Sequence, residues 1–153
     1  MSTRSNRQRS VNDRIRIAAQ ERGIDANRIR RGLVFQRILA RLAIRGVVLK
    51  GGFCLEVRLP ETARATKDMD LVGRMAITDD PLDLQDTLDE ALDVDTDDDG
   101  FTFDVGRPRH LRDETEDARA WRIPITAYLD REPFEHVKVD LVGQIDEVAG
   151  STE

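Results

Sequence analysis

The strongest constraint on the fold of this chain is a short apolar segment that ends in two adjacent glycines near residue 50. Val47–Leu49 forms the segment, and Lys50 and the Gly51-Gly52 pair follow it directly. Such a run, bounded by glycines, predicts a buried strand that stops at a tight turn. Because glycine carries no side chain, the backbone N–H groups of this turn are accessible to a phosphate.

Two carboxylates follow at the spacing of a strand. Asp68 and Asp70 flank Met69 and lead into an apolar pair, and we expect one strand over residues 63–72. Side chains two positions apart in a strand point to the same face, so both carboxylates would lie together. Two such groups repel each other unless a cation lies between them, and hard divalent cations prefer oxygen ligands. A phosphate-binding turn beside a metal-binding pair indicates nucleotide chemistry.

Lys50-Gly51-Gly52, followed by Arg64-Ala65-Thr66-Lys67-Asp68-Met69-Asp70, resembles the signature of the AbiEii/AbiGii-type nucleotidyltransferase toxins. These are relatives of MenT in the DNA polymerase beta-like superfamily. The resemblance implies an α+β fold with a mixed sheet, Mg²⁺ or Mn²⁺ as cofactor, and transfer of a nucleotide from an NTP. It also implies RNA, such as tRNA ends, as the acceptor, a cognate antitoxin as partner, and a role in toxin–antitoxin or phage-defence systems.

The same resemblance assigns roles to individual residues. Asp68 and Asp70 would hold the metal ions, together with a third acidic residue on a later strand, which we place at Asp140. In the strand expected over Val137–Val142, Asp140 shares a face with Lys138. The residues expected to contact the nucleotide are Lys50, Gly51, Gly52, Phe53, Arg64, Thr66 and Lys67.

Two departures from the family pattern keep an alternative open. Phe53 stands where the family usually has Thr or Ser, and we expect no counterpart of the family's helical C-terminal half in the residues after Asp140. One interpretation is therefore an active nucleotidyltransferase. The other is a catalytically impaired module that keeps the fold for binding or interaction.

We expect four regions in the chain: a flexible basic leader over residues 1–10, N-terminal helices over 11–46, a nucleotidyltransferase core over 47–143 and a tail over 144–153. Apolar spacing predicts helices over Val11–Arg22 and Asn27–Arg45, with Asp25 as the cap of the second. Within the core we expect a helix that has Pro81 in its first turn, a strand over Phe101–Val105, a loop over Arg107–Ala118, and a hairpin. The hairpin comprises strands over Trp121–Leu129 and Val137–Val142, joined by a turn over 130–133.

The charge of the chain is unevenly distributed. Residues 1–50 contain thirteen basic and three acidic side chains, although the net charge of the whole chain is −6. This asymmetry predicts either a nucleic-acid-binding arm or attraction between the two halves of the chain, and composition does not choose between them. Cys54 is the single cysteine and no segment has the length of a membrane span, so we expect a cytoplasmic protein without a membrane partner.

Overall fold

The computed structural model of the protein describes residues 6–49, 68–94, 99–111 and 120–143, which form helices and one mixed sheet. The helices are α1 (Asn6–Arg22), α2 (Ala26–Leu42) and α4 (Pro81–Leu92), with short 3-10 helices η1 (Ala43–Arg45) and η3 (Arg74–Ala76). The strands are β1 (Val48–Leu49), β2 (Asp68–Val72), β3 (Phe101–Val105), β4 (Arg109–His110), β5 (Ala120–Leu129) and β6 (Glu132–Val142). These elements confirm the expected α+β class.

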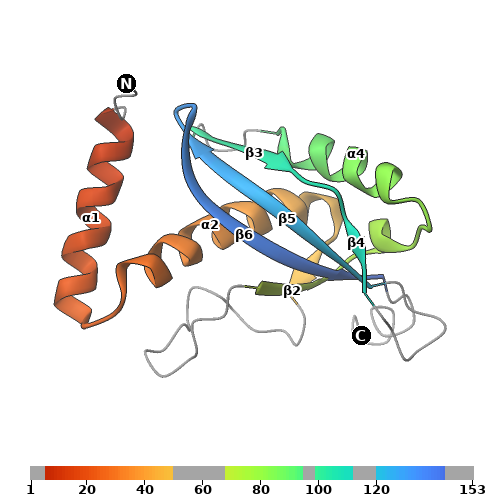
Figure 1. The fold of residues 1–153 in the computed structure, drawn as a ribbon, viewed down its shortest axis with the longest axis horizontal. Coiled ribbons are helices and arrows are strands. Elements are labelled where there is room, and N and C mark those ends of the chain that lie inside the picture. The colour runs from red at the N-terminus through yellow and green to blue at the C-terminus, as the bar shows by residue number, and fades with distance from the viewer. Residues whose placement is uncertain (1–5, 50–67, 95–98, 112–119, 144–153) are drawn as a thin grey trace.

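The six strands form one sheet in the order β1-β2-β6-β5-β3, and β4 also pairs with β5. β2 runs parallel to β6, whereas the other described strand pairs are antiparallel. β5 and β6 are the long central strands; α2 passes behind them in Figure 1, and α4 lies beside β3. α1 stands at one end of the sheet, beside the turn that joins β5 to β6.

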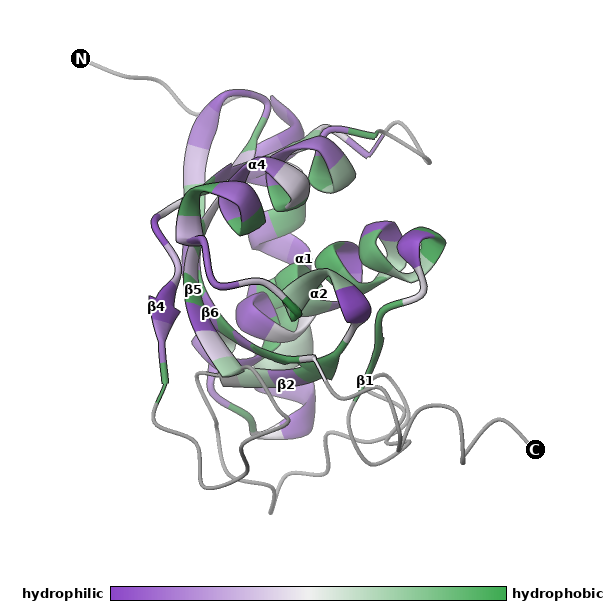
Figure 2. Cartoon of the chain, turned by 90° about the vertical axis from the view of Figure 1, so that its right-hand side faces the viewer, coloured by the Kyte–Doolittle hydropathy of each residue, from purple (hydrophilic) through white to green (hydrophobic). Residues whose placement is uncertain are grey.

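The hydrophobic core lies between one face of the sheet and the two helices α2 and α4. The predicted alternation of β5 is confirmed, because every second residue from Trp121 to Leu129 is buried. Figure 2 shows the sheet on one side and the helices on the other, with hydrophobic residues on the surfaces between them. The helical residues of this core are Val34, Phe35, Ile38 and Leu42 from α2, and Leu84, Leu88, Ala91 and Leu92 from α4. The opposite face of the sheet carries the polar residues, and we call it the open face.

A buried arginine joins α2, α4 and β3 within this core. Arg41 is 2% exposed. Its Nη1 donates to the backbone oxygens of Leu92 and Phe101, each at 3.2 Å, and its Nη2 donates to Oδ1 of Asp99 at 2.7 Å. The guanidinium also lies 4.9 Å from the centre of the Phe103 ring. Arg41 thus satisfies a carbonyl at the end of α4 and a carbonyl on the outer edge of β3.

The predicted start of the first helix at Val11 is wrong, because α1 begins at Asn6. The reason is a tertiary contact of Gln8, whose side chain is buried. Its amide nitrogen donates to the backbone oxygen of Leu129 at 3.2 Å and to that of Glu132 at 3.3 Å. Hydrogen bonds to carbonyls at the β5–β6 turn therefore stabilise the first turn of α1. The sequence did not predict this turn because it has little hydrophobic periodicity of its own.

Several other boundaries differ from the sequence prediction by a few residues. Asp25 caps α2 as expected, through a hydrogen bond from the Asn27 N–H, but α2 ends at Leu42 and η1 fills the remainder up to Gly46. Gly46 has a φ of +83°, a conformation that favours glycine. The expected loop over Arg107–Ala118 contains β4, and the expected turn over 130–133 is shorter, because β6 already begins at Glu132. Among the described helices, none is long and apolar enough to cross a membrane.

Candidate active site

The parallel pairing of β2 with β6 places two of the predicted site residues at directly opposite positions. Asp70 is the partner of Asp140, and Asp68 is the partner of Lys138. Opposite residues on neighbouring strands project to the same face. That face is the open face, because Met69, Leu71, Val139 and Leu141, which alternate with these residues, are buried in the core. The side chain of Asp68 lies outside the described part of the structure.

Asp140 is held by an arginine that the sequence analysis did not single out. Nε of Arg122 donates to Oδ1 of Asp140 at 2.8 Å, and Nη2 of Arg122 donates to Oδ2 at 3.0 Å. The Asp140 side chain is 16% exposed and that of Arg122 is 31% exposed. A two-point contact between a guanidinium and a carboxylate is stronger and more directional than a single hydrogen bond. Asp140 is therefore fixed in orientation next to Asp70.

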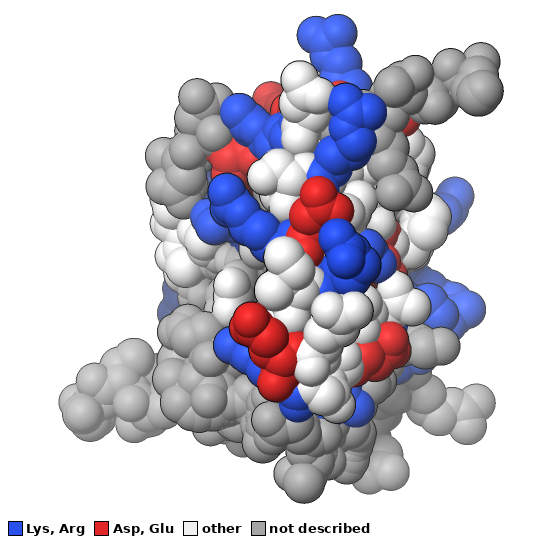
Figure 3. All heavy atoms as spheres, turned by 90° about the vertical axis from the view of Figure 1, so that its left-hand side faces the viewer, with Lys and Arg blue, Asp and Glu red and all other residues white. Residues whose placement is uncertain are grey.

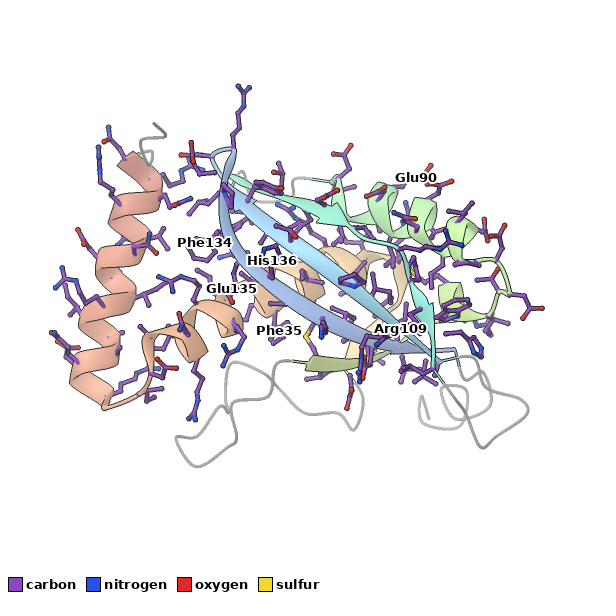
Figure 4. All side chains as sticks on the ribbon, in the orientation of Figure 1. Phe35, Glu90, Arg109, Phe134, Glu135 and His136 are labelled. Atoms are coloured by element: carbon purple, nitrogen blue, oxygen red, sulfur yellow. The ribbon has the colours of Figure 1, made fainter. Side chains whose placement is uncertain are left out.

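The paired positions continue across the sheet and form what we call the charged row: Asp70 on β2, Asp140 on β6, Arg122 on β5 and Arg109 on β4. Each is the direct cross-strand partner of the next. The row thus runs across four strands on the open face, with two negative charges followed by two positive charges. Arg109 is exposed at the outer end of the row (Figure 4). Lys138 and Pro124 occupy the corresponding positions beside Asp68 in the next row.

The donors of the charged row fit a divalent cation in type. Asp70 is exposed and Asp140 is half-buried, so both carboxylates can reach a cation over the open face, and both offer the oxygen ligands that Mg²⁺ and Mn²⁺ prefer. Among the described residues, no group of three or more histidine, cysteine, aspartate or glutamate side chains is close enough to hold a metal ion. Asp68, the third carboxylate predicted from the sequence, has a side chain that is not described.

The predicted nucleotide contacts lie outside the described residues. These are Lys50, Gly51, Gly52, Phe53, Arg64, Thr66 and Lys67. β1 ends at Leu49, and the partner of Leu49 is Leu71, which is next to Asp70 in the chain. The chain therefore leaves β1 one residue away from the charged row.

A second group of acidic side chains, on α4, lies away from the charged row. Partial burial raises the pKa of Asp89, and the neighbouring carboxylates of Asp104 and Asp86 raise it further. α4 packs on the core side of the sheet. Asp86 and Asp89 are therefore not placed to extend the open-face site.

The basic N-terminal region is partly neutralised by the rest of the chain. Arg7 pairs with Asp130 at 3.8 Å, Arg37 and Arg41 pair with Asp99, and Arg45 pairs with Glu90 at 3.9 Å. These ion pairs support the expected attraction between the two halves. Figure 3, which faces the α1 end of the molecule, still shows several Lys and Arg side chains on the surface, with acidic groups between them. Internal pairing therefore accounts for part of the basic charge, and other basic groups remain at the surface.

Comparison with known proteins identifies the family. The model of the family described as "Nucleotidyl transferase AbiEii toxin, Type IV TA system" matches residues 35–153, which is most of the chain. The match includes the whole charged row and the glycine pair, whereas α1 and the first part of α2 precede it. A search of curated proteins found no match. The chain belongs to the AbiEii family of nucleotidyl transferase toxins of type IV toxin–antitoxin systems.

Proposed function

We propose that this protein transfers a nucleotide from an NTP to a hydroxyl group of RNA, and that Asp68, Asp70 and Asp140 hold the Mg²⁺ or Mn²⁺ ions of the reaction. The observation that carries the proposal is the pairing of Asp70 with Asp140 on parallel neighbouring strands of the open face. Family membership supports the nucleotidyl transfer. The NTP, the metal and the RNA acceptor are the parts that we add.

The proposed reaction breaks a phosphoanhydride bond of the NTP and forms a phosphodiester bond to the acceptor. The acceptor oxygen forms a bond to the α-phosphorus of the NTP, the bond from that phosphorus to the bridging β-oxygen breaks, and pyrophosphate leaves. The proton of the acceptor hydroxyl passes to Asp140 or through it to water. Bound Mg²⁺ or Mn²⁺ would neutralise charge on the phosphates and lower the pKa of the attacking hydroxyl. Asp70, whose carboxylate is exposed beside Asp140, would orient the α-phosphate through that cation.

The nucleotide would enter from the side of β1. Because β1 ends next to the level of Asp70, Lys50 and the Gly51-Gly52 pair would offer a charge and backbone N–H groups to the phosphates. Arg64, Thr66 and Lys67 would add contacts from the segment before β2. Phe53 would lie where related chains carry a hydroxyl, so we expect Phe53→Thr to strengthen NTP binding.

Incubation with each of the four NTPs, labelled at the α-phosphate, tests the function directly. In the presence of Mg²⁺ and total RNA, we expect label from at least one NTP to enter RNA, together with equimolar release of pyrophosphate. Chelation of the metal should stop the reaction. Labelled RNA without Mg²⁺ would contradict the metal assignment, and no labelling with any NTP would favour the alternative of a binding module with an impaired site.

RNA binding by the N-terminal region is a separate prediction. Replacing Arg14, Arg22 and Arg31 together by Gln should reduce the slope of log K against log salt by about 2, since each phosphate contact to single-stranded RNA contributes about 0.7. A matched triple variant at Arg7, Arg16 and Arg45, which form ion pairs within the protein, should reduce the slope less. If the Arg14, Arg22 and Arg31 variant kept the slope of the unmodified protein, these arginines would not contact RNA. Filter binding over a range of salt concentrations provides the measurement.

The biological setting follows the family. Membership in a type IV toxin–antitoxin family implies a cognate antitoxin. We further place the reaction in the cytoplasm, where NTPs and RNA are present and where a single free cysteine, Cys54, is kept reduced. A role in phage defence would appear as protection of cells that express the active chain and loss of protection in cells that express an Asp140→Asn variant.

A further inference from the structure

Arg122 occupies the carboxylate that the proposed metal site needs. It contacts both oxygens of Asp140, at 2.8 and 3.0 Å. A guanidinium that binds a carboxylate in this two-point manner takes one lone pair on each oxygen and neutralises much of the negative charge, so the carboxylate attracts a divalent cation less strongly. Arg122 and a metal ion therefore compete for Asp140.

A second arginine makes it unfavourable for Arg122 to leave Asp140 without a replacement anion. Arg109 lies at the directly opposite position on β4, and like charges at opposite positions of an antiparallel pair repel each other. Losing Asp140 would remove its negative charge from beside two positively charged residues at opposite positions of the β4–β5 pair. A phosphate group provides that charge, because its oxygens accept hydrogen bonds from guanidinium groups in the same two-point geometry.

We propose that Arg122 is the counter-ion of Asp140 in the metal-free protein, and that a substrate phosphate bound by Arg122 and Arg109 releases Asp140 to the metal ion. This inference rests on the proposed function. It makes Arg122 a positioning residue that couples phosphate binding to metal binding. Such coupling is reciprocal, so the metal ion strengthens phosphate binding by the same factor. The phosphate belongs either to the NTP or to the acceptor RNA, since both carry the same chemical group.

Titration with Mn²⁺ tests this coupling without relying on turnover. The EPR signal of free Mn²⁺ reports binding to the protein alone, with a non-hydrolysable NTP analogue, or with a short RNA oligonucleotide. Each ligand is also titrated without protein, because phosphates bind Mn²⁺ themselves. We expect one ligand to raise the Mn²⁺ affinity of the protein about tenfold, which lies within the usual range for coupled sites. The ligand that does so identifies the source of the phosphate.

Arg122→Gln separates this role from a purely structural one. Without a competing guanidinium, the variant should bind Mn²⁺ about tenfold more tightly in the absence of phosphate, and added phosphate should raise the affinity less than about twofold. Loss of a structural ion pair would lower the melting temperature without strengthening metal binding. Arg131→Gln, in the β5–β6 turn away from the charged row, removes the same charge and should change neither quantity.

The outcomes distinguish this inference from the proposed function. A folded Arg122→Gln protein that binds Mn²⁺ no more tightly overturns the inference alone, provided that Asp70→Asn weakens Mn²⁺ binding. Mn²⁺ binding that is absent in every titration, or unaffected by Asp70→Asn, overturns the metal site and the inference together. If Arg122→Gln does not fold, Arg122→Lys keeps the charge and removes the two-point contact. It should then strengthen Mn²⁺ binding by a smaller factor, and an unchanged affinity would overturn the inference.

Discussion

Replacing Asp70 with asparagine should reduce nucleotide transfer by about a thousandfold while the fold stays intact. The substitution keeps the size of the side chain but removes a charge that would hold a metal ion beside the α-phosphate. A thousandfold loss corresponds to about 4 kcal/mol of transition-state stabilisation, which is the magnitude expected for impaired metal-ion catalysis. Because the Asp70 side chain is exposed, the Asp70→Asn protein should have nearly the same melting temperature as the unmodified protein in metal-free buffer. Initial rates of label transfer, measured with saturating NTP, provide the test.

Asp104→Asn is the matched control for this prediction. Asp104 lies on β3 opposite Thr126, so it shares the open face with Asp70 but stands outside the charged row. The Asp104→Asn protein should transfer nucleotide at a rate within about twofold of that of the unmodified protein. The substitution should also lower the pKa of Asp89, because it removes a neighbouring negative charge. Equal loss of activity in both variants would point to a general effect of surface charge. An Asp70→Asn protein that retained most of its activity would exclude Asp70 from the metal site.

The sequence predicted the parts of the fold that depend on local pattern. The alternation from Trp121 to Leu129 identifies a strand because period two is visible in a single segment. Asp25 and Gly46 mark the ends of the α2–η1 helical segment through their own backbone and side-chain chemistry. Gln8 and β4 were missed for the opposite reason. The first is held by carbonyls more than 120 residues away, and a strand of two residues exists only through its pairing with β5.

Only the acidic half of the candidate site was predictable from the sequence. Asp70 and Asp140 could be placed on one face from strand periodicity and from the family pattern. Arg122 required the register of the β5–β6 hairpin. Counting back from the turn pairs Leu129 with Glu132 and would place Arg122 opposite Val139, which points into the core. The irregularity between Ala127 and Tyr128 shifts the register by one residue and brings Arg122 opposite Asp140. No local signal in the sequence specifies that shift.

The largest effect on stability should come from Arg41→Met, which we expect to lower the free energy of unfolding by about 3–5 kcal/mol. Methionine fills much of the same volume, but it leaves the carboxylate of Asp99, which is 10% exposed, without its closest cation. The backbone oxygens of Leu92 and Phe101 also lose a donor. For a chain of this size, the loss corresponds to a decrease of about 10 °C in melting temperature. Urea denaturation followed by circular dichroism provides the measurement.

Two further variants show whether the lost charge pairing is the cause. Arg45→Met removes an ion pair with Glu90 at 3.9 Å between exposed side chains, so it should cost less than about 1 kcal/mol. Combining Arg41→Met with Asp99→Asn removes the unpaired buried charge, and should therefore recover part of the stability lost in Arg41→Met. The cost of Asp99→Asn is measured twice, in the unmodified protein and in Arg41→Met. If Asp99→Asn lowered the free energy of unfolding by the same amount in both, the two residues would act independently. The loss would then have to come from the packing of Arg41 against Phe103 and from its backbone contacts, because its pairing with Asp99 would contribute nothing.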